Sequence, residues 1–371
     1  NAEQEIASSL NPQIRFFKVE NTAAAAPADD VKAAWSSASP ATTGGYSAAG
    51  YFFARHLHSK LKVPVAILQA PWGGTPAESW VRASALSADP ALMPVYAHWA
   101  RIVEAYPDNL LRHRRAVAQW EAGPRQGPRP NPPAGPGHPH EPSVLWNGMI
   151  APLVPYSIRG VIWYQGETNA TAARAPYYWR LFSTLITDWR KAFGQGDFPF
   201  LFVQLANYAR PGTNDGWPLL REAQLQTLAL NNTAMAVTID IGEAQDIHPK
   251  NKQDVGLRLA LPALALAYGE KVVYSGPIFR QAAREAGAMR LWFDHAGSGL
   301  KARGGVLEGF EIAGADGKYV PAEARIEDNT VVVMSPAVKE PVKARYAWAD
   351  DPRATLINAE GLPASPFRTA E

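Results

Sequence analysis

The order of apolar and amphipathic stretches is the strictest constraint on how this chain folds. Up to about residue 269, short runs rich in β-branched and aromatic residues alternate with longer stretches in which apolar residues recur at helical spacing. The apolar runs are 14–19, 64–70, 160–164, 198–205 and 234–240, and the helical stretches are 47–62, 84–122, 174–193, 218–230 and 252–268. Strands that alternate with helices are typical of a parallel β-sheet covered by helices. We therefore predict an α/β fold for this part.

The last hundred residues have a different period. Short runs separated by Gly, Asp and Pro indicate strands without helices between them. This pattern predicts two domains, an α/β domain at 1–268 and a small antiparallel β domain at 269–371. Within the first domain, segment 123–142 carries eight prolines and is predicted to be an irregular excursion.

Composition narrows the kinds of function. The formal net charge is +2 and no run rich in Lys and Arg is present, which argues against nucleic acid or a membrane surface as the partner. No apolar run approaches the roughly 18 residues that a membrane-spanning helix needs. The sequence has no cysteine, which excludes disulfides, a thiolate nucleophile and cysteine metal sites. The 12 Trp and 13 Tyr residues suit a neutral, carbohydrate-like substrate, although most are expected in the core.

Residues 160–169, GVIWYQGETN, place polar side chains directly after a buried strand. In parallel sheets, ligands bind at the carboxyl ends of the strands. Gln165 and Asn169 have amides that can donate hydrogen bonds to a developing oxyanion, and Glu167 is either a base or a carboxylate that ties down the loop. The alternative is a loop whose polar groups only satisfy one another. The residues alone leave this choice open.

His248 is the histidine best placed for acid–base chemistry. It follows the strand at 234–240, precedes a helix and lies two residues after Asp246. This position fits a general base held over the edge of the sheet, and the alternative is an ordinary surface histidine.

The other histidines are weaker candidates. His56 and His58 lie two residues apart on a helix and so point to different faces. His138 and His140 offer two metal ligands without a third. We therefore predict no metal site and no cofactor.

A nucleophile is harder to identify. Ser47 lies in GYSAAG, which is one residue longer than a nucleophile elbow and has no strand before it. We interpret Ser47 as a helix cap. The chain then carries a base and oxyanion donors without an attacking group.

Four segments and the closing stretch carry a resemblance to a known family. The four are QAPWGGTPAESW (69–80), LWNGMIAPL (145–153), GVIWYQGETNA (160–170) and DIHPKNKQDVGLRLAL (246–261), and the closing stretch is 345–369. Together they resemble the sialate O-acetylesterase family of SGNH hydrolases, which includes bacterial carbohydrate acetylesterases. The resemblance implies a flavodoxin-like three-layer sandwich and a secreted or periplasmic serine esterase. Its substrate would be an acetylated sugar, such as a sialic acid or a plant cell-wall glycan like xyloglucan or xylan.

The resemblance also implies the members of a catalytic pair. His248 is the implied base, and Asp246 is the implied acid that orients its imidazole. Many SGNH enzymes place the acid three residues before the histidine, where this chain has Gln245. A backbone carbonyl therefore stays open as the partner of the imidazole.

The oxyanion donors follow from the same motif match. They are the backbone N–H of Gly74 and the side-chain amide of Gln165, with Gly73 as the alternative glycine. Glu167 is then implied to support the loop, together with Asn169, and is no longer the base.

The family's nucleophile belongs to a Gly-Gln-Ser-Asn motif after the first, central strand of the sheet, and residues 1–371 contain no such motif. We therefore expect the serine and its strand upstream of Asn1, most simply in a companion N-terminal fragment. The rival hypothesis from another class is a non-catalytic carbohydrate-binding protein on an esterase fold. A lipase or peptidase of the same fold is a third, weaker hypothesis.

Overall fold

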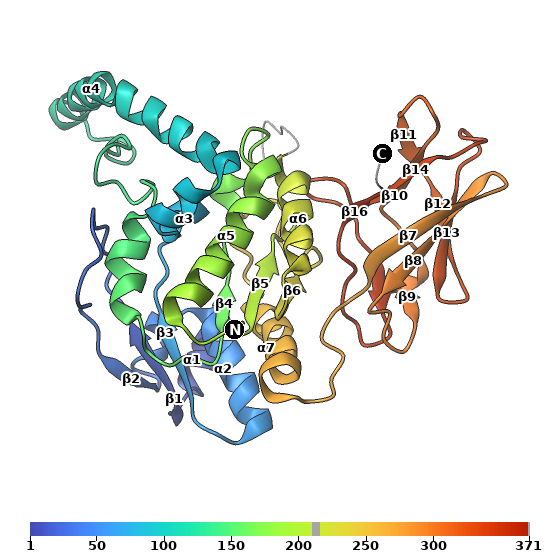
Figure 1. Cartoon of the computed structure of the whole chain (residues 1–371), viewed down its shortest axis with the longest axis horizontal. Coiled ribbons are helices and arrows are strands. Elements are labelled where there is room, and N and C mark those ends of the chain that lie inside the picture. Colours follow the sequence, from blue (N-terminus) through green and yellow to red (C-terminus); the bar gives the residue numbers. More distant parts are fainter. Residues whose placement is uncertain (210–215, 370–371) are drawn as a thin grey trace.

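Parallel strands form the centre of the first part of the chain (Figure 1). The structure is a computed structural model that describes residues 1–209 and 216–369. One parallel set has the order β4 (Val161–Trp163), β5 (Phe200–Gln204) and β6 (Thr233–Val237). A second set has the order β2 (Trp35–Ala38), β1 (Asn11–Lys18) and β3 (Val65–Gln69), in which β1 and β3 are parallel and β2 is antiparallel to β1. The predicted parallel α/β arrangement is confirmed.

Helices cover both faces of these strands because the strand side chains alternate between two cores. Leu201 and Val203 pack with residues of α2 and α7, whereas Phe200 and Phe202 pack with residues of α5 on the other face. Helix α2 also packs against α7, and α5 against α6. The helices are α1 (Ala2–Ala7), α2 (Ala48–Leu61), α3 (Ala83–Ala88), α4 (Met93–Ala122), α5 (Ala175–Phe193), α6 (Gly216–Gln226) and α7 (Lys252–Tyr268).

Short helical turns connect these elements and shape the strand ends. They are η1 (Thr43–Gly45), η2 (Ala77–Trp80), η3 (Pro90–Leu92), η4 (Trp146–Ile150), η5 (Ala151–Leu153), η6 (Glu167–Asn169), η7 (Thr227–Ala229) and η8 (Arg303–Gly305). Two of them, η2 and η6, follow β3 and β4 and build the site described below.

Two details differ from the sequence expectations. The predicted helical stretch 84–122 is broken between α3 and α4, because Asp89 is extended before a proline and its side chain caps the next turn by accepting from Ala91 N–H at 2.9 Å. Strand β2 lies between the apolar run 14–19 and the helical stretch that begins at residue 47, where no strand was predicted because its sequence WSSA is not an apolar run.

The C-terminal β region, residues 278–368, is antiparallel as predicted (Figure 1). Two four-stranded sheets have the orders β11-β10-β14-β16 and β12-β13-β8-β7, and β15 pairs with β9. The strands are β7 (Ile278–Glu285), β8 (Ala288–Asp294), β9 (Leu300–Ala302), β10 (Phe310–Ala313), β11 (Tyr319–Pro321), β12 (Glu323–Glu327), β13 (Thr330–Met334), β14 (Lys343–Tyr346), β15 (Leu356–Asn358) and β16 (Phe367–Arg368). The division into two domains at residue 268 stays a prediction.

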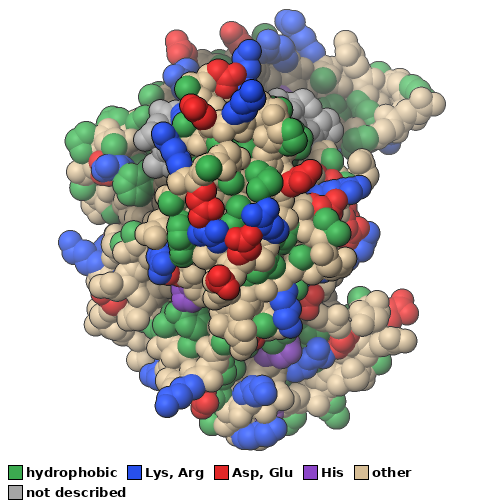
Figure 2. Space-filling model, turned by 90° about the vertical axis from the view of Figure 1, so that its right-hand side faces the viewer, with side chains coloured by type: hydrophobic (Ala, Val, Ile, Leu, Met, Phe, Trp, Pro, Cys, Tyr) green, Lys and Arg blue, Asp and Glu red, His purple; other side chains and the backbone are tan. Residues whose placement is uncertain are grey.

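The distribution of surface charge and the character of the helices bear on whether the chain binds a charged partner or a membrane. Figure 2 shows acidic and basic side chains interspersed over the face that includes the C-terminal β region. Among the described residues, no helix combines the length and apolar character needed to cross a membrane.

Candidate active site

The turn after β3 and the loop after β4 meet, although they are about ninety residues apart in the sequence. The Gln165 Nε2 donates to the Thr75 carbonyl at 3.1 Å, and the Thr168 hydroxyl donates to the Gly74 carbonyl at 2.9 Å. The structure therefore brings together two of the blocks that the sequence singled out, at the carboxyl ends of two strands.

The glycine turn presents backbone donors that are not used within the part of the chain described. Gly74 has a φ of 75°, a conformation that favours glycine. No hydrogen bond between described residues uses the N–H of Gly73 or Gly74. A Cβ built on either residue would meet no atom within 4 Å, so the space beside the turn is open. Unpaired N–H groups beside open space are what an oxyanion hole requires.

The amide of Gln165 is fully engaged. Its Nε2 donates to Asn169 Oδ1 at 2.7 Å as well as to the Thr75 carbonyl, and its Oε1 accepts from the Tyr178 hydroxyl at 2.8 Å. An amide nitrogen has two hydrogens, and both have acceptors here. Gln165 would have to release one of them to bind an oxyanion, and its role as a donor stays a prediction.

Asn169 joins the two loops from a fully buried position. Its Oδ1 also accepts from Ala77 N–H at 3.0 Å, and its Nδ2 donates to Glu78 Oε2 at 2.9 Å. Glu78 forms an ion pair with Arg174, in which the side chains are only 4% and 12% exposed. This buried network fixes η2 against η6.

Glu167 is half-buried beside the same loop. Burial raises the pKa of its carboxyl group. The backbone N–H groups of Glu167 and Gly166, to which the carboxylate is hydrogen-bonded, and the positive charges of His248 and Lys252 oppose that rise. Glu167 is therefore held by backbone groups of its own loop.

His248 lies on an exposed loop between β6 and α7. Its side chain is 89% exposed, and its Nδ1 is 3.7 Å from Asp246 Oδ1. That distance is too long for a hydrogen bond, whereas the backbone N–H of His248 donates to the same oxygen at 2.9 Å. The residues predicted as base and acid are thus neighbours in one turn, and no hydrogen bond among the described residues holds the imidazole ring.

The serine and the histidines of the weaker predictions have clear positions. Ser47 Oγ accepts from Gly50 N–H at 3.2 Å at the start of α2, which confirms it as a helix cap.

His138 and His140 lie edge to face with ring centres 4.5 Å apart. Burial lowers the pKa of His140, whose ring is hydrogen-bonded to the backbone of Gly74. The described residues contain no cluster of three or more His, Cys, Asp or Glu that could hold a metal ion.

Several residues of the site were not identified from the sequence. Glu78 lies inside the block 69–80 and is its only acidic residue, which was a signal. Tyr178 lies in the predicted helical stretch 174–193, whose apolar spacing gives no sign of its hydroxyl contact. His140 lies in the proline-rich excursion, 66 residues from Gly74, and no local pattern connects the two.

A cavity of about 640 Å³ extends from the site between β3 and β4. The two strands are not hydrogen-bonded to each other. The cavity is lined by both strands and, at the end nearest the site, by Gly73, Thr75 and Gln165. Strand β5 is buried at all five positions, whereas Ala66 of β3 is exposed and Val161 of β4 is half-buried. Apolar strand residues thus face open space in the middle of the sheet.

Comparison with known proteins shows which family the chain belongs to. Residues 146–264 match the family model described as carbohydrate esterase, sialic acid-specific acetylesterase. The sialate O-acetylesterase of Rattus norvegicus is 31% identical, over 99% of this chain and 73% of that protein. The chain belongs to the sialate O-acetylesterase family. The human sialate O-acetylesterase is 32% identical over 75% of this chain and 52% of its own length.

A solved member of this group of esterases has the same fold. The crystal structure of a carbohydrate acetylesterase from Xanthomonas citri matches with a TM-score of 0.83 and 40% identity, over 99% of this chain and 76% of that one. The resemblance to sialate O-acetylesterases expected from the sequence is therefore confirmed. The matched family segment contains Gln165, Glu167, Asn169, Asp246 and His248, whereas the glycine turn lies outside it.

Proposed function

We propose that this protein is a carbohydrate O-acetylesterase of the SGNH type, acting through a serine acyl-enzyme. The observation that carries the proposal is the meeting of the glycine turn with the Gln165 loop, where the N–H groups of Gly73 and Gly74 are unused among the described residues and Gly73 lines a cavity. The family match over residues 146–264 includes His248, which supports this residue as the base. Membership in a family of named acetylesterases supports the reaction class.

In the proposed mechanism His248 acts as the base. A serine oxygen attacks the acetyl carbonyl carbon while its proton moves to the imidazole, and the N–H groups of Gly73 and Gly74 stabilise the oxyanion. The intermediate then expels the sugar hydroxyl group, which takes the proton from the imidazolium. Water attacks the acetyl-enzyme with the same proton relay and releases acetate. Asp246 would orient the imidazole after a small rotation closes the 3.7 Å separation.

Gln165 would contribute only if it exchanges one of its amide acceptors for the oxyanion. Glu167 and Asn169 are proposed as supporting residues, because both hold the loop that follows β4.

We propose that the nucleophile reaches the site on a strand that fills the space between β3 and β4. Two facing strand edges without partners, with apolar side chains between them, favour an added strand, because unpaired backbone groups and exposed apolar surface are both costly. The end of such a strand would lie beside Gly73 and Gln165. Neither Ser47, which caps α2, nor any other described serine or threonine hydroxyl group is hydrogen-bonded to the His248 ring. The serine is therefore proposed to lie outside residues 1–371, in the same polypeptide or in a companion fragment.

The proposed substrate is an acetylated carbohydrate, and the proposed location is the periplasm or the extracellular space. The names of the relatives support sialic acids or other acetylated glycans as the class. Acetylated plant cell-wall glycans such as xyloglucan and xylan are equally proposed as substrates. Measuring acetate release from a panel of acetylated sugars would distinguish them from acetylated sialic acids.

The test uses the complete protein and an aryl acetate. His248→Ala is expected to reduce hydrolysis by several orders of magnitude, because the residue both accepts and returns the proton. His58→Ala, at the end of α2, is the matched control and should retain wild-type activity. Hydrolysis by His248→Ala within a few fold of wild type would show that His248 is not the base.

A fluorophosphonate label followed by peptide mass spectrometry identifies the nucleophile. We expect the label on a serine outside residues 1–371, and a label on Ser47 would contradict the strand proposal. Binding of glycans without acetate release or labelling would instead indicate the carbohydrate-binding alternative.

A further inference from the structure

The loop that carries His248 has shallow apolar anchorage, because Ile241 and Ile247 are only partly buried against the cores. In residues 241–250, the His248 loop, only Pro249 is buried. Contacts within the loop give it a shape: the Lys250 side chain pairs with Glu243 at 2.8 Å, and Asp246 N–H donates to the Glu243 carbonyl at 3.1 Å. These contacts lie within the loop, so its position relative to the sheet depends on the partly buried Ile241 and Ile247 and on hydrogen bonds to other elements.

Those bonds come from the segment that follows β5. Asn207 Oδ1 accepts from Gly242 N–H at 2.7 Å, and Ala209 N–H donates to the Ala244 carbonyl at 3.0 Å. A Cβ on Gly242 would lie 2.1 Å from the Asn207 backbone oxygen, so the two segments touch where only glycine fits. Asn207 therefore sets where the His248 loop begins.

The C-terminal β region in turn holds Asn207. Asp351 Oδ1 accepts from Asn207 Nδ2 at 2.7 Å, and Tyr208 N–H donates to the Asp350 carbonyl at 3.1 Å. The fully buried Arg221 reinforces this junction, because its guanidinium donates to carbonyls on both sides, at 2.8 Å to Leu205 and 2.7 Å to Ala349. The contacts to residues 349–351 join parts of the chain that are more than 120 positions apart. The bond from Arg221 to Leu205 anchors the segment that contains Asn207.

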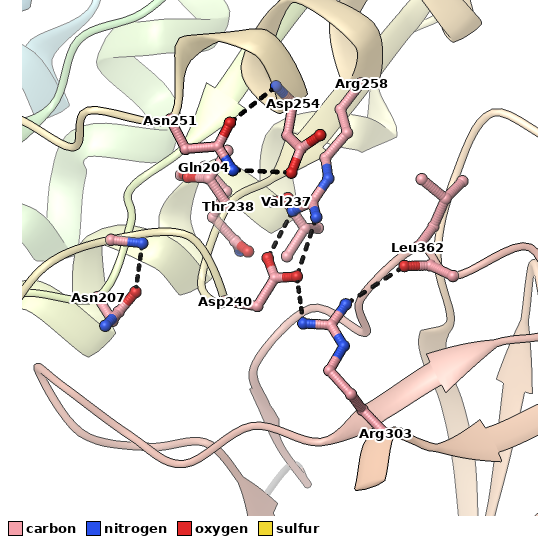
Figure 3. A network of polar contacts seen from close by, with 12 residues as sticks. Gln204, Asn207, Val237, Thr238, Asp240, Asn251, Asp254, Arg258, Arg303 and Leu362 are labelled. Atoms are coloured by element: carbon pink, nitrogen blue, oxygen red, sulfur yellow. Dashed lines mark hydrogen bonds and ion pairs between the residues drawn. The ribbon is translucent and has the colours of Figure 1, made fainter. Parts of the chain in front are cut away.

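A second link reaches the other side of the loop start (Figure 3). Asp240, just after β6, lies between Arg258 of α7 and Arg303 of the C-terminal β region. The carboxylate is 3% exposed, and its closest contacts are 2.5 Å to Arg258 and 2.6 Å to Arg303. Figure 3 shows the Asp240 carboxylate between the guanidinium groups of Arg258 and Arg303, and the Asn207 side chain hydrogen-bonded to a neighbouring backbone N–H.

We infer that the C-terminal β region positions the catalytic base, with Asp351 acting through Asn207 as a positioning residue for His248. The inference rests on the proposed role of His248 as the base. The inference gives the C-terminal β region a role in catalysis. The proposed reaction by itself does not call for such a role. Asp351 touches neither the imidazole nor the reacting atoms, and it acts by keeping the Asn207 side chain oriented toward Gly242.

Hydrogen exchange measured by mass spectrometry tests the inference independently of activity. In Asp351→Ala, peptides that cover residues 241–250 should exchange roughly three- to tenfold faster, the factor that corresponds to one modest hydrogen bond. Asp351→Asn keeps an acceptor oxygen for Asn207 and should restore near wild-type exchange. Arg353→Gln is the matched control, because Arg353 pairs only with Glu308 in the side-chain contacts recorded and is 83% exposed.

Hydrolysis of an aryl acetate by the complete protein gives the second readout. We expect Asp351→Ala to lower kcat roughly three- to tenfold with KM unchanged, since it displaces the base without altering substrate contacts. Exchange in residues 241–250 equal to wild type would overturn the inference whatever the activity. Faster exchange throughout α5 as well would also overturn it, because Asp351 would then only stabilise the fold. If wild-type protein lacked hydrolysis, the proposed function would fail, while the exchange result would still decide whether Asp351 positions the loop.

Discussion

The Gln165 side chain donates a hydrogen bond of 2.7 Å to Asn169 Oδ1, within one turn of the same loop. The same Asn169 oxygen accepts from Ala77 N–H, which lies after the other strand of the site. One buried amide thus connects the ends of β3 and β4. The loop geometry at the proposed oxyanion hole depends on this amide together with the buried Glu78–Arg174 ion pair.

Asn169→Ala is expected to destabilise the protein strongly. The substitution removes the acceptor of the Ala77 N–H, one of the two acceptors of the Gln165 amide nitrogen and one donor to Glu78, all in a buried place. We expect the free energy of unfolding to fall by about 2–4 kcal/mol, the combined effect of several buried polar groups left unsatisfied. Urea denaturation measures the change. Asn131→Ala, at an exposed position of the proline-rich excursion, should change stability by less than about 0.5 kcal/mol; equal losses in both variants would refute the role given to Asn169.

Gly74→Ala and Gly73→Ala form a matched pair in the glycine turn. Neither added methyl group meets an atom within 4 Å, and only Gly74 has a positive φ, at 75°. Alanine at residue 74 should therefore cost about 1–2 kcal/mol of stability, or shift the turn, whereas alanine at residue 73 should cost less. Thermal unfolding and acetate release are the measurements. A larger stability loss at residue 73 than at residue 74 is incompatible with this backbone geometry.

Glu167→Gln is expected to change how stability depends on pH. Burial raises the pKa of Glu167 above its ordinary value of 4.5, so the folded state holds this proton more tightly than the unfolded chain. The resulting contribution to stability is complete below about pH 4.5 and is lost as the pH rises through the folded pKa. Glutamine cannot ionise, so the variant should lose less stability than wild type over that rise.

Denaturant unfolding at a series of pH values provides the comparison for Glu167. Glu20→Gln, an exposed substitution with the same change of charge, is the control and should follow the wild-type profile. If Glu167→Gln and wild type have parallel profiles, the carboxylate is not protonated more readily in the folded state.

The sequence predicted the elements better than their contacts. The run FPFLFVQL predicted the buried strand β5, and Ser47 was identified as the cap of α2, because both signals lie within a few residues. Strand β2 escaped prediction because an edge strand of Ser and Ala has no apolar signature. The motif match identified the loops of the site, but it gave no indication that both hydrogens of the Gln165 amide already have acceptors.

The sequence by itself determined the order of strands and helices, the family resemblance, and the residues that follow each strand. These depend on local periodicity and on motifs that are contiguous in the chain. Only the tertiary structure decided that Glu78 pairs with Arg174, that His140 touches Gly74, and that Asp351 holds Asn207. Such partners are distant in sequence and meet only when helices and strands pack. Burial in addition makes the Glu78–Arg174 ion pair costly to break.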